Sequence, residues 1–457
     1  MIPIPHLRLE HDMNAKGSKT NDSSKWLEGW DPNEEGKWDS KIAWRTLWVT
    51  TYALTLGFIS WFLVSALAPK LNNLGFDLSK KELYWLAAMP GLAGGGLRLI
   101  WMFLPPILGT RKLVTYSTAL LLLPLIGWSV AVRNPSTPFI GLLALGFLSG
   151  LGGGIFSGFM PSTSYFFPKS RQGMALGLQA GIGNFGVSIV QFVTPLIVAS
   201  AMFGATLGAP QHFVNKDKGI DTFAWYQNAG LLWVPFVLVA VVLAWTMLKS
   251  VPIKARGVSD QLDIFKNKHT WLMTLLYVMT FGTFSGLSAQ FGLLIKNLFG
   301  EFANAPDPVK FAFYGPLIGS AARVVSGPFA DRLGGGILTF VSGVGIAGSS
   351  IFTAFQLSPQ SSDDFMSFFW GMMAIFFFAG VGNASTFKQM PMIFAPRQAG
   401  GVIGWTGAIA AFGPFGFGVL LSFVAPKSFF LGVAVFAIMG ACVAWWFYAR
   451  SAAEKRS

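Results

Sequence analysis

The sequence predicts an all-α, polytopic membrane protein with twelve transmembrane helices in two pseudo-symmetric six-helix halves. Of its 457 residues, 53% are hydrophobic and 12% are charged, whereas soluble domains carry about 25% charged residues. Apolar runs of about 20 residues, each long enough to cross a bilayer, recur along nearly the whole chain. The longest polar interruption after the N-terminal tail, residues 249–268, divides these runs six and six. That is the layout of a transporter built from two parallel repeats.

Residues 1–43 are polar and of mixed charge, without the apolar stretch that a secretory signal peptide needs. Tryptophans recur from Trp26 to Trp48, and tryptophan favours the membrane interface. We expect a cytoplasmic tail that rests on the membrane face. A regulatory or gating tail is the alternative.

The predicted spans follow in two groups. The N-terminal half, residues 44–248, contains spans 45–67, 82–107, 112–132, 138–166, 172–202 and 223–248. After a cytoplasmic linker at 249–268, the C-terminal half, residues 269–450, contains spans 270–298, 309–330, 336–356, 365–395, 398–424 and 428–449. Residues 451–457 form a cytoplasmic C-terminal tail. Spans longer than 25 residues imply tilt or protrusion.

The distribution of Lys and Arg predicts the orientation. With both termini inside, the inner loops and C-terminus hold about 14 of these residues and the outer loops about nine, as the positive-inside rule requires. The net charge of +13 therefore reflects the ends of the spans, and we expect no nucleic-acid partner.

Arg98 lies in the middle of the second span, in the stretch AAMPGLAGGGLRLIWMF. A cation inside lipid costs from about 2.5 to more than 10 kcal/mol, so such a residue faces a protein interior or a wet cavity. Arg323 repeats the arrangement in the eighth span, since Gly109 and Gly334 each lie eleven residues after their arginine. The alternative is that each side chain reaches the interface. For Arg98 the distance to Gly109 is about 16 Å, which is too far; Arg323 lies nearer the end of its span.

The 20 acidic residues all fall in tails, loops or the ends of helices. This excludes the commonest proton relay, a buried carboxylate, and leaves both arginines without an acidic partner inside the membrane. A bound anion is the partner we expect. The planar guanidinium suits a flat oxyanion because it donates two parallel hydrogen bonds.

The fifth and eleventh spans are rich in glycine. Close helix packing is the ordinary use of such patterns. Sliding of helices during alternating access and close approach of a small anion are the functional alternative, and Asn184 is placed to donate a hydrogen bond. The signature glycines are Gly177, Gly181, Gly183, Gly186, Gly404 and Gly407.

The fourth and tenth spans also match each other, because Phe156 and Phe387 each precede a Met-Pro pair. Each ring is either part of the core or a wall for a flat ion. Tyr277, in the seventh span, has a hydroxyl that can donate to an anion. The single cysteine, Cys442, allows no intrachain disulfide. We expect no metal, no cofactor and no enzyme activity.

The chain resembles the NarK-type nitrate/nitrite porters of the major facilitator superfamily over about residues 26–450. The resemblance rests on PGLAGGGLRLI, GFMPSTSYFFPK, ALGLQAGIGNFGVSIVQ, LLYVMTFGTFSGLSAQF, GPLIGSAARVVSGPFADRLGG and GNASTFK. It implies the major facilitator fold. It also implies that Arg98 and Arg323 clamp the anion, that Phe156 and Phe387 sandwich it, and that Tyr277 and Asn184 bond to it.

Two features depart from the family pattern. The loop GTRK after the second span keeps little of the superfamily's loop motif, and Lys388 stands beside Phe387 where some members have a neutral residue. Lysine is the cation here whose protonation its surroundings can alter, so Lys388 is a candidate for proton coupling. Snorkelling to the inner face, or a fixed third charge in an exchanger, are the alternatives.

Together with these observations, the resemblance implies a monomeric nitrate transporter of the bacterial inner membrane, with nitrite as a second ligand, that works by alternating access. Proton-coupled nitrate uptake is the favoured mode. Nitrate/nitrite exchange without proton movement, and a carrier for another small anion, are the alternatives; a non-transporting sensor would need a signalling domain.

Overall fold

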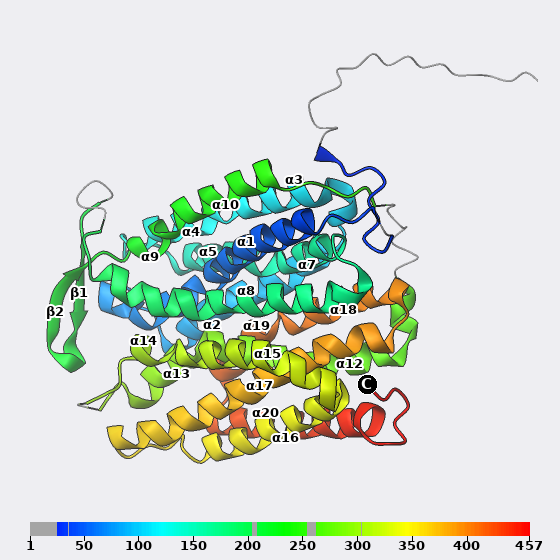
Figure 1. Ribbon diagram of the computed structural model, residues 1–457. Coiled ribbons are helices and arrows are strands. Elements are labelled where there is room, and N and C mark those ends of the chain that lie inside the picture. The colour runs from blue at the N-terminus through cyan, green and yellow to red at the C-terminus, as the bar shows by residue number, and fades with distance from the viewer. Residues whose placement is uncertain (1–24, 35, 203–207, 254–261, 303) are drawn as a thin grey trace, which may run out of the picture.

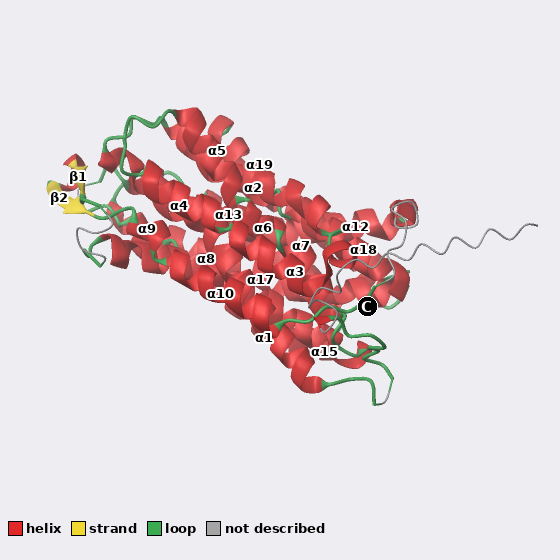
Figure 2. Ribbon diagram, turned by 90° about the horizontal axis from the view of Figure 1, so that it is seen from above, coloured by secondary structure: helices red, strands yellow, loops and turns green. Residues whose placement is uncertain are grey.

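The computed structural model describes residues 25–34, 36–202, 208–253, 262–302 and 304–457. Most of the described chain is helical, and the helices run roughly along one common direction (Figures 1 and 2).

The elements before residue 249 form what we call the first helix set, with one β-hairpin. They are α1 (Ser40–Leu67), η2 (Ala68–Leu74), α2 (Lys80–Trp101), α3 (Pro105–Leu120), α4 (Leu122–Ala131), α5 (Phe139–Ser149), α6 (Leu151–Gly154), α7 (Phe156–Ser164), α8 (Lys169–Val198), β1 (Gln211–Asn215), η4 (Lys216–Lys218), β2 (Ile220–Ala224), α9 (Asn228–Leu231) and α10 (Trp233–Met247).

The elements after residue 261 form the second helix set. They are η5 (Leu262–Lys266), α12 (Lys268–Tyr277), the π-turn η6 (Val278–Gly282), α13 (Thr283–Phe299), α14 (Pro308–Phe311), α15 (Tyr314–Leu333), α16 (Gly335–Ala354), η7 (Ser362–Asp364), α17 (Phe365–Ile393), α18 (Pro396–Ala410), α19 (Gly413–Phe423), α20 (Pro426–Ala444) and the π-turn η8 (Trp445–Ala449).

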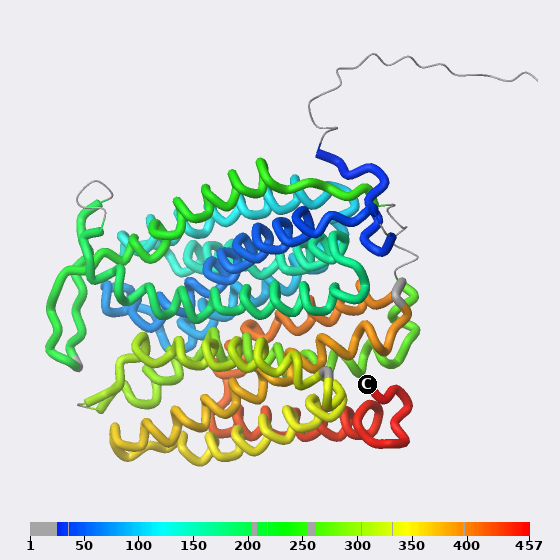
Figure 3. Tube along the Cα trace, viewed as in Figure 1, coloured from blue at the N-terminus to red at the C-terminus, as the bar shows by residue number. Residues whose placement is uncertain are grey.

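The two helix sets lie side by side, the first above the second in the view of Figures 1 and 3. They meet where α2 packs against α18 and α19, and where α8 packs against α15. The antiparallel hairpin β1–β2 marks one end of the bundle, which we call the hairpin end. The end of α10, before the linker, and the start of α12, after it, lie at the opposite end, the linker end (Figure 1).

Ten helical stretches among the described residues are long and apolar enough to cross a membrane. Two further long helices, α2 and α15, run beside them and are the ones that carry Arg98 and Arg323. Together they agree with the twelve spans predicted from the sequence. The chain is a multi-pass membrane protein.

A glycine in the left-handed region follows each arginine-bearing helix: Gly334 caps α15 directly, whereas Gly109 lies beyond the end of α2, inside α3. Gly109 has φ +70° and Gly334 has φ +91°, a left-handed region that glycine enters without the strain that a Cβ brings. At the other end of α2, Ser79 and Glu82 form a capping box that fixes where the helix starts. The eleven-residue spacing seen in the sequence thus corresponds to a repeated backbone turn.

The segment before α1 packs on the protein at the linker end, and α1 begins at Ser40, a few residues earlier than the predicted span. The indole nitrogen of Trp30 donates to the carbonyl of Tyr165 at 3.1 Å, and that of Trp38 donates to the carbonyl of Phe166 at 2.9 Å. These tryptophans therefore hold the segment against the loop between α7 and α8.

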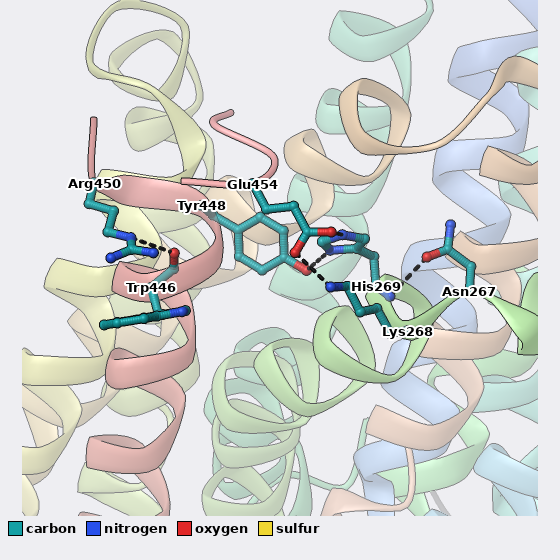
Figure 4. A network of polar contacts seen from close by, with 7 residues as sticks. All are labelled: Asn267, Lys268, His269, Trp446, Tyr448, Arg450 and Glu454. Atoms are coloured by element: carbon teal, nitrogen blue, oxygen red, sulfur yellow. Dashed lines mark hydrogen bonds and ion pairs between the residues drawn. The ribbon is translucent and has the colours of Figure 1, made fainter. Parts of the chain in front are cut away.

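The C-terminal residues are tied to the start of α12 (Figure 4), at the linker end of the bundle (Figure 1). Glu454 accepts a hydrogen bond from Lys268 Nζ at 2.7 Å and lies 3.3 Å from His269 Nε2. The other ring nitrogen of His269 lies 2.9 Å from the Tyr448 hydroxyl. This contact links the tail to two helices of the second set, so it is part of that set's packing.

Candidate anion-binding site

Arg98 is fully buried and joins the two helix sets. Its Nε donates to the carbonyl of Gly153 in α6 at 2.9 Å, and its Nη1 donates to the carbonyl of Gly407 in α18 at 2.6 Å. Its Nη2 is buried without a partner. One edge of the guanidinium is therefore held by backbone carbonyls while another donor stays available.

Aromatic rings surround the Arg98 guanidinium. Its Cζ lies 4.4 Å from the ring centre of Phe156, and 5.3 Å from those of both Trp61 and Phe281. Such cation–π contacts are strongest where water is excluded. Trp61 is fixed in turn, because its indole nitrogen donates to the carbonyl of Pro90 at 2.8 Å.

Arg323 lies in α15 and is 4% exposed. Its Cζ is 5.5 Å from the ring centre of Phe387. With the Asn184 amide oriented to satisfy both of its ends, the side-chain oxygen accepts from Arg323 Nη1 at 3.0 Å and the nitrogen donates to the carbonyl of Ala180 at 3.2 Å. Asn184 of the first helix set thus contacts the arginine of the second.

Tyr277 is fully buried, and its hydroxyl has no hydrogen-bond partner. Its ring stacks on Phe281 with centroids 5.4 Å apart and lies 6.0 Å from Phe387. The π-turn η6 begins at the next residue. Turns of this kind occur often at functional sites, and this one re-aims the helix directly beside the unpaired hydroxyl.

Phe156 and Phe387 meet in this structure. Their ring centroids are 6.4 Å apart and their planes are inclined by 80°, an edge-to-face arrangement that aromatic pairs favour. The two matching rings from the two helix sets do come together, but they are not parallel walls here. A sandwich around a flat ion stays a prediction.

The signature glycines serve several contacts. A Cβ on Gly407 would lie 3.7 Å from Arg98 Nη1, and one on Gly404 would lie 3.2 Å from Met102. In α8, Gly181 faces Val324 of α15, whereas Gly183 and Gly186 face α1 at Leu54 and at the Thr55 carbonyl. Gly177 faces open space. Close helix packing therefore accounts for Gly181, Gly183 and Gly186. At Gly407 the missing side chain lets Arg98 lie close to the backbone of α18.

Lys388 follows Phe387 in α17 and is partly buried. Carboxylates are remote from the two arginines: within the described ranges, neither Arg98 nor Arg323 forms an ion pair with Asp or Glu. The site is cationic, and its unpaired donors, Arg98 Nη2 and the Tyr277 hydroxyl, suit an anion with several acceptor oxygens.

Sequence reasoning missed Trp61, Phe281 and the Gly153 carbonyl. Phe281 lies four residues after Tyr277 and so shares its helix face, which was a usable signal. Trp61 and Gly153 gave none, because a tryptophan or a glycine in an apolar run is ordinary in a membrane helix.

The helical architecture and the buried cationic site between two helix sets define a membrane transporter rather than an enzyme. A family model described as Major Facilitator Superfamily matches residues 49–411. The chain belongs to this superfamily, and within it to the NarK-type porters.

Two curated relatives carry that assignment. The chain is 59% identical over 435 residues to the "Probable nitrate/nitrite antiporter NarK2" of Thermus thermophilus. The aligned region spans 94% of this chain and 98% of that protein. It is 36% identical over 373 residues to the "Nitrate/nitrite transporter NarU" of Escherichia coli strain K12, with 80% and 78% covered.

Solved structures support the fold. A bacterial homologue of the human lysosomal transporter Spinster, in an inward-facing and unoccupied conformation, superposes with a TM-score of 0.64. The superposed region spans 89% of this chain and 97% of that protein, and the sequence identity is 13%. This likeness therefore concerns the fold alone.

Proposed function

We propose that this protein carries nitrate, with nitrite as a second ligand, across the bacterial inner membrane by alternating access, with both termini in the cytoplasm. The observation that carries the proposal is the pair of buried arginines, Arg98 and Arg323, which form no ion pair with a carboxylate among the described residues. The printed names of the 59% and 36% identical relatives, a nitrate/nitrite antiporter and a nitrate/nitrite transporter, support the choice of ligand.

In this proposal the anion lies between the two arginines. Arg98 Nη2 and the Tyr277 hydroxyl, both without partners, donate to its oxygens, while Asn184 orients Arg323. Nitrate and nitrite are planar, so the guanidinium fork and the faces of Phe156 and Phe387 suit them better than a bulky organic acid.

The site residues come from both helix sets, so binding and closure are linked. Arg98, Phe156 and Asn184 belong to the first set, and Arg323, Tyr277 and Phe387 to the second. Without the anion, the guanidinium groups of Arg98 and Arg323 repel each other across the interface between the two helix sets. A bound anion reduces this repulsion. A ligand shifts a conformational equilibrium by the difference in its affinity for the two states, and here the anion favours the closed one.

The test is uptake of labelled nitrate into proteoliposomes, with nitrite, chloride, sulfate and a small carboxylate as competitors. We expect nitrate uptake that nitrite inhibits and the other anions do not. Transport of the carboxylate in preference to nitrate would overturn the proposal and favour a carrier for another small anion.

The coupling mode is a second proposal with two candidates. The position of Lys388 beside Phe387 favours proton-coupled uptake, because a bound anion and a proton on lysine would stabilise each other. The name of the 59% identical relative favours exchange of nitrate for nitrite.

One variant separates the candidates. Proton coupling through Lys388 predicts that Lys388→Gln loses uptake driven by a pH gradient but keeps uptake driven by internal nitrite. If the wild type shows no pH-driven uptake, the protein is an exchanger; if the variant retains it, Lys388 is not the coupling residue.

A further inference from the structure

Asn383, in α17, is buried without hydrogen-bond partners. Its side chain is 0% exposed, and neither the amide oxygen nor the amide nitrogen has a partner. A side-chain amide offers two donors and one acceptor, and buried polar atoms in proteins are nearly always paired. In the described part of the chain, Gln179 alone shares this condition of two unpartnered amide atoms. An amide in this condition can hold either a water molecule or a ligand, and its position decides which.

Asn383 lies on the face of α17 that carries Phe387. The two residues are four positions apart and so stack on one face of the helix. Phe376, seven residues earlier on the same face, packs against Phe284 of α13. This face therefore looks into the interior of the second helix set, and not toward lipid.

Asn383 lies about 6 Å along the helix from Phe387, toward the hairpin end. The start of α17 is at that end, since Phe365 packs on Phe311, close to the residues that the hairpin contacts. The neighbouring helix α15 runs the same way, and a Cβ on Gly380 would collide with the Gly319 carbonyl of α15. Gly319 lies four residues before Arg323.

Because Gly319 and Gly380 are level, Arg323 and Asn383, four and three residues further along their helices, lie at nearly the same height. Side chains of a helix tilt toward its N-terminus, which for both α15 and α17 is the hairpin end. Both side chains therefore extend toward that end, and the Cζ of Arg323 stays 5.5 Å from the Phe387 ring. Asn383 is thus a buried donor without a partner among the described residues, at the level of the Arg323 guanidinium.

We propose that Asn383 is a second contact for the transported anion, at the height of Arg323 within the second helix set. Its amide nitrogen donates to an oxygen of the ion as the ion enters or leaves. This rests on the proposed function, whose ligand is a small planar oxyanion. A neutral donor suits such a position, because transport needs binding that is favourable enough to enter and weak enough to leave.

The test compares Asn383→Leu with wild type. Leucine has a similar shape, and replacing an unpaired polar group by an apolar one of that shape need not destabilise the fold. We expect an unchanged or higher melting temperature together with a roughly tenfold slower nitrate uptake, since a hydrogen bond to a charged ligand contributes about this factor.

Gln179→Leu is the matched control. Gln179 has the same two unpartnered atoms, but it shares its face of α8 with Gly183 and Gly186, which pack on α1. We expect its uptake to stay within about twofold of wild type, because the amide contributes no contact to the ion. Asn383→Ser and Asn383→Ala form a second pair, in which serine keeps a donor and alanine does not.

Several outcomes would overturn the proposal. Wild-type uptake in Asn383→Leu would show that the amide holds a water molecule instead of the anion. Equal losses in the Asn383 and Gln179 variants, or equal rates for the serine and alanine variants, would show a packing role. Nitrate uptake by the wild-type protein tests the proposed function. The ratio of the uptake rate of the variant to that of the wild type tests the role of Asn383, so the two proposals can fail separately.

Discussion

At the scale of single residues, the guanidinium of Arg98 combines structural and binding contacts. Two of its nitrogens are held by carbonyls from different helix sets, at 2.9 and 2.6 Å, and the third has no partner. A lysine ammonium is a compact point charge without the planar fork. It cannot reach both carbonyls and still present a donor to a ligand in the same plane.

We therefore expect Arg98→Lys and Arg323→Lys to lower nitrate uptake by about a hundredfold, because each loses about two charge-assisted hydrogen bonds. Uptake into proteoliposomes measures the loss, and the elution profile and melting temperature show whether the variant is folded. Arg450→Lys is the control. Arg450 donates to the Trp446 carbonyl at 3.0 Å at the linker end (Figure 4). Near wild-type uptake by either site variant would contradict the clamp.

A site residue can be predicted from its own residue type only if that type is energetically unusual in a membrane span. Arg98 and Arg323 are visible from sequence because a charge in a membrane span is expensive. Phe156, Phe387 and Tyr277 are not, because aromatic residues are common in any apolar core, and only the repeat and the resemblance single them out. Asn383 escaped notice because its condition, a buried amide without partners, exists only in three dimensions.

At the scale of the elements, the helices that carry the arginines are the least apolar of the long ones. Neither α2 nor α15 is among the stretches that qualify as spans by composition, since glycine, serine and arginine dilute their hydropathy. Two of their boundaries follow from local chemistry: the Ser79 capping box starts α2, and the left-handed Gly334 ends α15. The sequence predicts these elements from their matched spacing. The helix breaks within α5–α7 depend on packing and were not predicted.

A pair of glycines in α8 gives a prediction about packing. A Cβ on Gly186 would collide with the Thr55 carbonyl and lie 2.9 Å from Phe58, whereas one on Gly177 would meet nothing within 4 Å. We expect Gly186→Ala to lower the melting temperature and uptake strongly, because a backbone carbonyl cannot move aside. Gly177→Ala should be neutral or stabilising by up to about 1 kcal/mol from helix propensity. Thermal unfolding in detergent measures both, and equal stability of the two variants would refute the packing account.

The contact between the C-terminal residues and α12 predicts a pH dependence. The hydrogen bond from Lys268, with a further one from His269, holds the pKa of the Glu454 carboxyl below its usual range. A carboxyl with a lowered folded-state pKa stabilises the fold above its unfolded pKa of about 4.3, and this stability is lost as the pH falls through the folded value.

The variant Glu454→Gln should therefore melt below wild type at pH 7, and the difference should shrink as the pH falls below about 4. Melting curves across this range measure it. Because the contact is exposed to solvent, high salt should also reduce the difference. A gap between the two proteins that is independent of pH would show that the carboxylate charge contributes nothing.

At the scale of the whole molecule, the two helix sets are joined at the hairpin end by contacts that no local pattern predicts. Lys70 Nζ lies 2.8 Å from Asp307 Oδ1, and Lys218 Nζ donates to the Ala305 carbonyl at 2.7 Å. The partners lie on opposite sides of the linker in sequence. The fold class follows from composition and span count, but these long-range pairs depend on how the sets dock.

We expect the Lys70–Asp307 ion pair to stabilise the state that is closed at the hairpin end. Its side chains are 13% and 27% exposed, so solvent screens it incompletely. In a double-mutant cycle with Lys70→Asp and Asp307→Lys, each reversal alone should change the uptake rate, and the double reversal should restore it. The cycle should give a coupling of roughly 1 kcal/mol.

The ion pair between Lys80 and Glu301 is the control for this cycle. It spans 3.9 Å and its side chains are 70% and 93% exposed, so its coupling should be close to zero. Equal coupling energies for the two pairs would show that the Lys70–Asp307 contact has no special part in closure.

The absence of carboxylates around Arg98 and Arg323, noted for the described residues, has a consequence for energetics across the membrane. An electric potential acts on unbalanced charge, by about 2.3 kcal/mol per elementary charge per 100 mV. The empty site carries two guanidinium charges, and a monovalent anion leaves one. A conformational step that moves the site through part of the electric field is therefore more sensitive to voltage when the site is empty than when it holds an anion. Nitrate/nitrite exchange always returns loaded, so it should depend less on voltage than one-way uptake by the same protein.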